Sequence, residues 1–208
     1  MRLHPSETID HLTPEDALQY LRDGNARFLS NLRLNRNLLQ QVNETREGQW
    51  PFAAILSCID SRTSAELIFD QGLGDLMSVR IAGNCLNDDI LGSLEFSCEV
   101  TGATVVVVLG HSHCGAIKGA CDGVEMGHLT GLLQKIRPSL DAIEEPTDGK
   151  ERSSRNTKFV DAVARENVRR TTALVLERSP ILQELVEAGN LIVVGGMYDV
   201  QSGAVEFL

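Results

Sequence analysis

Apolar residues in the middle of the chain form short, unbroken runs, the pattern of strands buried on both faces of a parallel sheet. Stretches of helical spacing separate these runs. This alternation predicts an α/β fold: a mostly parallel central β-sheet flanked by helices. The expected strands cover residues 52–57, 76–81, 104–109 and 191–194, with a possible fifth at 204–208. The expected helices cover residues 64–70, 90–100, a segment from Gly115, 128–137, 157–177 and a short segment from Pro180.

The first 50 residues have a different character. Thr13 and Pro14 are typical of the start of a helix, which is expected to end near Gly24 or to continue to Leu29. Residues 30–50 are rich in Asn, Gln and Arg, and we interpret them as an arm that lies over another surface. Residues 144–156 form a second polar stretch, expected to be a loop. Residues 1–208 therefore make a single domain with an N-terminal helical arm.

Composition narrows the functional classes. The chain has 208 residues, 42% of them hydrophobic, and a formal net charge of −10. An acidic surface disfavours binding to nucleic acid and to anionic membranes. No run is long and apolar enough to span a bilayer, and the first residues lack the apolar core of a secretory signal, so a cytoplasmic location is expected. Five cysteines, an odd number, suggest buried, catalytic or metal-bound thiols in a reducing compartment.

Two motifs follow predicted strands. Cys58-Ile59-Asp60-Ser61-Arg62 comes after the first strand, and Gly110-His111-Ser112-His113-Cys114-Gly115 comes at the end of the most apolar strand. Thiolate and imidazole are good zinc ligands, and three protein ligands leave a fourth position open, as in catalytic zinc sites. The ligands are too far apart in sequence for a zinc finger. Two other interpretations stay open: a cysteine on an apolar strand is often a small core residue, and an Asp–Arg pair can simply fix a loop.

Together these motifs resemble the signature pair of the β-class carbonic anhydrases. Residues 80–84 (RIAGN) are similar to a further family segment, and residues 193–208 resemble the family's closing hairpin. The resemblance implies one Zn²⁺ per subunit, with Cys58, His111 and Cys114 as ligands. It implies a catalytic dyad of Asp60 and Arg62, in which Asp60 can also swing to the metal. Because Ile55 replaces a tryptophan found in some members, the open, dyad-paired form is expected.

The resemblance also implies a set of substrate-binding residues. Gln49 is expected to reach substrate across a dimer interface, and Gly115 to present its backbone N–H. Met77 and Phe96 stand where relatives often have phenylalanine and tyrosine, so they are expected to form apolar walls for carbon dioxide. The full expected set is Gln49, Met77, Ala82, Phe96 and Gly115.

The expected activity is reversible hydration of carbon dioxide to bicarbonate and a proton by a homodimer or homotetramer, with residues 1–50 packing on a partner subunit. Alternatives are hydrolysis of carbonyl sulfide or carbon disulfide on the same scaffold, a non-catalytic zinc or bicarbonate-binding module, and a thiol redox protein that uses Cys58 and Cys114. His113 and His128 are candidate proton shuttles, although structural roles are favoured for both. Cys98 is expected in the core, and Cys85 and Cys121 receive no role.

Overall fold

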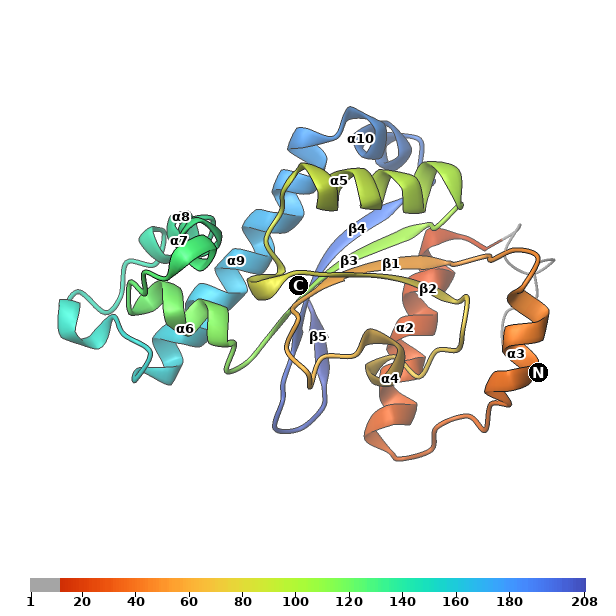
Figure 1. The fold of residues 1–208 in the computed structure, drawn as a ribbon, viewed down its shortest axis with the longest axis horizontal. Coiled ribbons are helices and arrows are strands. Elements are labelled where there is room, and N and C mark those ends of the chain that lie inside the picture. The colour runs from red at the N-terminus through yellow and green to blue at the C-terminus, as the bar shows by residue number, and fades with distance from the viewer. Residues whose placement is uncertain (1–11) are drawn as a thin grey trace.

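A five-stranded sheet forms the centre of the molecule (Figure 1). The computed structural model describes residues 12–208. The strand order is β2-β1-β3-β4-β5; the first four strands run parallel and β5 runs antiparallel to β4. This confirms the predicted α/β fold with a mostly parallel sheet. The strands are β1 (Ala53–Ser57), β2 (Leu76–Arg80), β3 (Val105–His111), β4 (Ile192–Tyr198) and β5 (Val205–Phe207).

Helices cover both faces of the sheet, which explains why β1 and β3 are buried along their whole length. One face packs against α2 and α4, and the other against α5, α9 and α10. The helices α6, α7 and α8 form a lobe beside α9, beyond one end of the sheet (Figure 1). The helical elements are α2 (Pro14–Leu29), α3 (Leu38–Thr45), α4 (Ala65–Ile68), η1 (Ala82–Asn84), α5 (Asp88–Glu95), the π-helical turn η2 (Phe96–Val100), α6 (Gly115–Cys121), α7 (Gly127–Gln134), α8 (Arg137–Asp141), η3 (Gly149–Glu151), α9 (Thr157–Arg178) and α10 (Pro180–Glu187).

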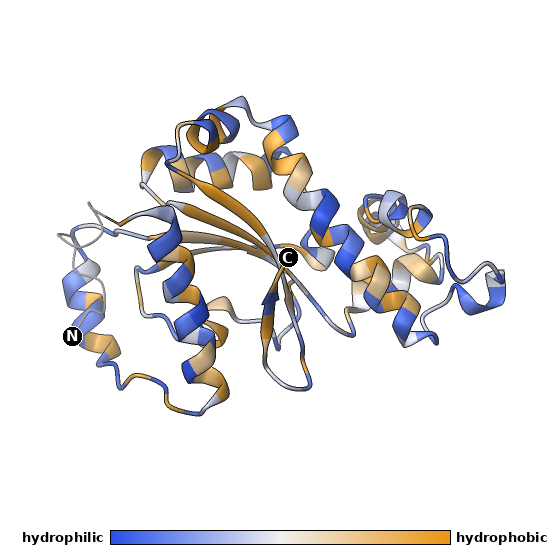
Figure 2. Ribbon diagram, turned by 180° about the vertical axis from the view of Figure 1, so that it is seen from behind, coloured by the Kyte–Doolittle hydropathy of each residue, from blue (hydrophilic) through white to orange (hydrophobic). Residues whose placement is uncertain are grey.

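Successive residues of the central strands supply two separate cores, because side chains alternate across a strand. Ala54, Leu56 and Cys58 belong to the core beneath α5–α10, whereas Ala53 and Ile55 belong to the core beneath α2 and α4. Figure 2 shows the result: the central strands are mostly hydrophobic, while the helices carry polar residues on their outer sides. Among residues 12–208, no helix is both long and apolar enough to cross a membrane.

The N-terminal helix begins as predicted, since the Thr13 side chain accepts a hydrogen bond from the Asp16 N–H, and it continues to Leu29. The arm after it contains a short helix that was not predicted. Residues 38–45 form α3, capped by Asn37, whose side chain accepts from the Gln40 N–H. The many amide side chains of this region concealed that local helix signal.

A buried carboxylate fastens the arm to the domain. Asp70 pairs with Arg27 of α2 and with Arg36 of the arm, and it accepts a hydrogen bond from the Leu34 N–H. Gln41 of α3 is also buried and accepts a hydrogen bond from the Leu73 N–H. The arm therefore has a defined position on this chain.

Two further boundaries differ from the prediction. The helix expected over 128–137 is two helices, α7 and α8, because Pro138 lies in the first turn of α8. The strand expected over 191–194 continues through Gly195 and Gly196 to Tyr198. A Cβ at Gly195 would lie 2.7 Å from Val168 Cγ1, so the glycine allows α9 to approach the sheet rather than ending the strand.

Candidate active site

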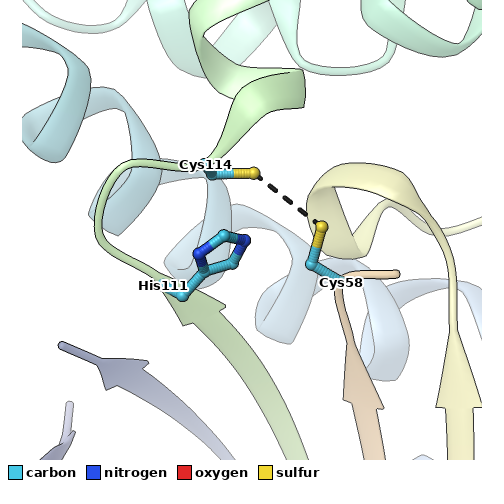
Figure 3. A group of neighbouring side chains, drawn as sticks. All are labelled: Cys58, His111 and Cys114. Carbon is cyan, nitrogen blue, oxygen red and sulfur yellow. Dashed lines mark hydrogen bonds between the residues drawn. The ribbon is translucent and has the colours of Figure 1, made fainter. Parts of the chain in front are cut away.

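The three predicted zinc ligands meet at the carboxyl edge of the sheet (Figure 3). Cys58 follows β1 directly, His111 is the last residue of β3, and Cys114 immediately precedes α6. Because β1 and β3 are parallel neighbours, their ends lie side by side. One ligand atom from each residue lies within 4.8 Å of the other two, and the Cys58 and Cys114 sulfurs are 3.9 Å apart. The alternative of an isolated core cysteine therefore fails for this group.

The chemistry of this group fits a zinc ion. His111 Nδ1 lies 2.9 Å from the Ser112 carbonyl oxygen, to which it donates, so Nε2 carries the free lone pair. Nε2 is buried and has no hydrogen-bond partner in the described chain, as expected for an atom reserved for a metal. Two sulfurs and one imidazole nitrogen are a typical donor set for zinc with one position open.

The two thiols also differ in acidity. A hydrogen bond from Cys114 lowers the pKa of the Cys58 thiol, and His111 and the Gly83 N–H lower it further against the opposing effect of burial. The same thiol pair and burial raise the pKa of Cys114. A bound divalent cation favours the thiolate form of both cysteines, because a thiol must lose its proton to bind a metal.

Asp60 and Arg62 form a bidentate pair beside this group. Arg62 donates from Nε to Asp60 Oδ1 at 2.9 Å and from Nη2 to Oδ2 at 2.7 Å, and its backbone N–H also donates to Oδ1. These bonds hold the pKa of the Asp60 carboxyl well below its usual range. Asp60 is not one of the three clustered ligands, so the structure has the predicted dyad pairing and not the alternative position of Asp60 as a fourth ligand.

Arg80 was noted in the sequence only as part of a similar segment, yet it fixes the backbone of this loop. Its guanidinium donates to the Cys58 carbonyl oxygen at 2.9 Å and to the Asp60 carbonyl oxygen at 2.6 Å. Thr63 Oγ1 donates to the same two carbonyls. Arg80 and Thr63 therefore hold the backbone of the loop independently of the Asp60–Arg62 pair. That pair is free to take part in the reaction.

A mostly apolar hollow of about 260 Å³ opens beside the cysteines. Two of the predicted substrate residues, Ala82 and Gly115, line it together with Cys58 and Asp60. Sequence analysis missed the rest of its wall, which comes from α6 and α7. The spacing of small residues on the helix after Cys114 was a usable signal. These additional lining residues are Ile59, Ala116, Gly119, Leu129 and Leu133.

The other predicted substrate residues lie elsewhere on this chain. Met77 and Phe96 line a separate hollow between β2 and α5, where Phe96 is 50% exposed. Gln49 is exposed at the end of the arm and lines neither of these two hollows. None of these three residues lines the hollow beside the cysteines.

The two candidate proton shuttles and the three remaining cysteines lie outside the metal-ligand group. His113 has a positive φ of 58°, and its Nε2 lies 3.2 Å from the Gln201 side-chain nitrogen, so its ring is held by a neighbour. His128 is exposed in the first turn of α7. Cys98 is buried, as predicted, and Cys85 is buried too, whereas Cys121 is half-buried. These observations give neither histidine a contact with the clustered ligands.

Known proteins resemble this chain over most of its length. The family described as carbonic anhydrase matches residues 53–205. "Carbonic anhydrase 2" of Mycobacterium tuberculosis is 34% identical over 198 residues, which cover 91% of this chain and 90% of the relative. The β-carbonic anhydrase of Coccomyxa has a similar fold, with a TM-score of 0.73 at 23% identity over 92% of this chain and 86% of that one. Tetrameric β-carbonic anhydrases of Sordaria macrospora match with a TM-score of 0.68 at 22% identity, over 93% of this chain and 97% of theirs.

Proposed function

Because the chain belongs to the β-class carbonic anhydrases, a zinc-dependent family, we propose that it hydrates carbon dioxide reversibly at one zinc ion bound by Cys58, His111 and Cys114. The observation that carries the proposal is the convergence of two sulfurs and the unpartnered His111 Nε2 at the carboxyl edge of the sheet. Bound zinc supplies hydroxide near neutral pH by lowering the pKa of water.

The residues around the metal group have distinct tasks in this proposal. Asp60 accepts a hydrogen bond from the attacking water and orients it toward carbon dioxide, while Arg62 keeps Asp60 ionised and in place. The small apolar side chains of α6 and α7 suit a small apolar substrate. Two thiolates donate more charge than imidazoles do, so the water should be less acidic than with three histidines, and the rate should rise through mildly alkaline pH.

A second copy of the chain is the proposed partner. Apolar side chains are exposed on α3 and beside the Met77–Phe96 hollow, and a subunit interface would cover them. In a dimer, Gln49, Met77 and Phe96 of one subunit would complete the pocket of the other. The exposed apolar residues are Leu38, Leu39, Val42, Phe96 and Val100. The five free cysteines support a reducing, cytoplasmic location.

The zinc assignment is tested by removing one ligand and, as a matched control, one cysteine outside the group. Cys58→Ala should lose both bound zinc and carbon dioxide hydration, measured by metal analysis and stopped-flow with a pH indicator. Cys98→Ala removes a similarly buried thiol and should keep one zinc per chain and most of the activity. Stoichiometric zinc in the Cys58 variant, or zinc-loaded protein inert toward carbon dioxide, would contradict the proposal.

The interface is tested by light scattering. Leu39→Asp puts a charge on α3, where Leu39 is 78% exposed, and should yield monomers that hydrate carbon dioxide poorly. Val124→Asp puts the same charge on an exposed apolar position of the lobe and should leave both the mass and the rate unchanged. An oligomer that survives Leu39→Asp would exclude α3 from the interface.

A further inference from the structure

A buried hydrogen-bond chain connects two helices of the lobe side to the backbone beside Cys58. Ser139 Oγ of α8 donates to Asn167 Oδ1 at 3.3 Å, and Asn167 Nδ2 of α9 donates to the Gly83 carbonyl oxygen at 2.9 Å. The Gly83 N–H in turn donates to the Cys58 sulfur at 3.4 Å. In Figure 3, the yellow turn next to the Cys58 sulfur is η1, which contains Gly83.

Position 83 in the turn η1 requires a glycine. Gly83 has a φ of +67°, in the left-handed region that favours glycine. A Cβ there would lie 2.9 Å from Ile136 Cδ1 and 3.2 Å from Ala116 Cβ. Gly83 therefore presents the N–H of its preceding peptide to Cys58, while the carbonyl oxygen of its following peptide accepts from Asn167 and its Cα is packed against Ile136 and Ala116.

Asn167 makes the shorter of two side-chain hydrogen bonds to the Gly83 carbonyl oxygen; the other comes from the Cys85 thiol at 3.6 Å. Asn167 is 3% exposed, lies on α9 far from β1 in sequence, and its side chain spans from Ser139 to Gly83. A buried amide with both ends satisfied is costly to replace and specifies one geometry. The α9 helix also packs on β3 and β4, so the position of Asn167 is tied to the sheet that carries His111.

We infer that Asn167 is a positioning residue for the metal centre: by holding the carbonyl oxygen of Gly83 it fixes this residue in η1 so that the Gly83 N–H, in the preceding peptide, hydrogen-bonds the Cys58 sulfur. Partners behind a metal ligand fix its orientation, and their loss typically weakens metal binding about 10- to 100-fold. The inference rests on the proposed zinc site, in which Cys58 is a ligand. It adds a requirement that lies outside the ligands, the dyad and the substrate pocket.

The test compares Asn167→Leu, similar in size but unable to donate to Gly83, with Thr171→Val. Thr171 is buried one turn further along α9, so its replacement removes a buried polar group from the same helix. The first readout is zinc affinity by competition with a chromophoric chelator. We expect affinity to fall at least about 10-fold in Asn167→Leu and to stay within about 2-fold of wild type in Thr171→Val.

A second readout reports on the sulfur itself. In cobalt-substituted protein, the thiolate-to-cobalt absorption bands should shift in Asn167→Leu and not in Thr171→Val, because only the first loses the oriented N–H. If the leucine variant does not fold, Asn167→Ser is used, since its side chain is too short to reach the Gly83 carbonyl.

The outcomes separate the two claims. Wild-type protein that binds no zinc overturns the zinc site and this inference together. Wild-type protein that binds zinc, with an Asn167 variant of equal affinity and unchanged cobalt bands, overturns this inference alone and leaves Asn167 as a core residue. An equal loss of affinity in Thr171→Val would also overturn it, because the effect would then come from general loosening of α9.

Discussion

Gly110 precedes the metal-ligand candidate His111 on β3, and we expect Gly110→Ala to destabilise the protein by about 2–3 kcal/mol. An added Cβ would lie 2.5 Å from Val168 Cγ2 and 2.9 Å from Met197 Sδ, both closer than real Cβ contacts. The methionine can adapt. Val168 is fully buried in α9, and a β-branched side chain in a helix has essentially one rotamer. Because β3 is also paired on both sides, the upper part of the usual overpacking range of about 1–3 kcal/mol applies.

The assay is urea unfolding followed by circular dichroism, at one protein concentration and with excess zinc, since subunit association and metal binding both change apparent stability. Gly131→Ala is the matched control: Gly131 is exposed on α7, nothing lies within 4 Å of its added Cβ, and helix propensity predicts a gain of about 1 kcal/mol.

A double-mutant cycle with Val168→Ala tests the cause. Shortening Val168 makes room for the new methyl group, so the double variant should be at least about 1 kcal/mol more stable than the sum of the single effects. Additive effects, or a Gly110 variant as stable as the Gly131 variant, would refute the steric argument.

Three further predictions concern charged groups. Arg62→Ala should lower kcat for carbon dioxide hydration about 100-fold in stopped-flow while metal analysis still finds one zinc per chain; loss of the zinc would show that the pair holds the fold of the site instead. Asp199 accepts hydrogen bonds from Ser202, Gln201 and Ser112, which lower its pKa from 3.8 to about 2. The stabilising effect of the ionised Asp199 carboxylate is complete above pH 3.8 and is lost as the pH falls through about 2. The difference in free energy of unfolding between metal-free wild type and Asp199→Asn, measured by urea unfolding, should therefore shrink over that pH window. A constant difference would contradict the role given to these hydrogen bonds. Asp70→Asn should speed amide hydrogen exchange in residues 30–37 about 10-fold or more and leave β3 unchanged; an equally protected arm would show that Asp70 is not its anchor.

Much of the fold was predictable because its strongest elements have unambiguous patterns. The four valines of β3 and the apolar run of β1 indicated doubly buried parallel strands, and the two motifs at their ends indicated a shared edge. The family resemblance drawn from those motifs is confirmed, as are the α/β fold and the convergence of Cys58, His111 and Cys114.

What escaped prediction depends on contacts between distant segments. The chain from Ser139 through Asn167 to Gly83 joins residues far apart in sequence, and no local pattern indicates it. The two glycines at 195 and 196 indicated the end of a strand, because the reason for Gly195, the close approach of α9, lies in another element. The substrate assignments of Gln49, Met77 and Phe96 remain predictions, since none of the three lines the hollow beside Cys58 in this chain.

The 3.9 Å gap between the Cys58 and Cys114 sulfurs has a practical consequence for handling the protein. An oxidant that removes two electrons and two protons would join two such sulfurs by a bond of about 2.05 Å. We expect a chelator-treated sample left in air to lose its capacity for the proposed zinc ion until a reductant reopens the bond. Metal and reductant are therefore storage conditions for this protein, and inactive preparations should be reduced before they are judged inert.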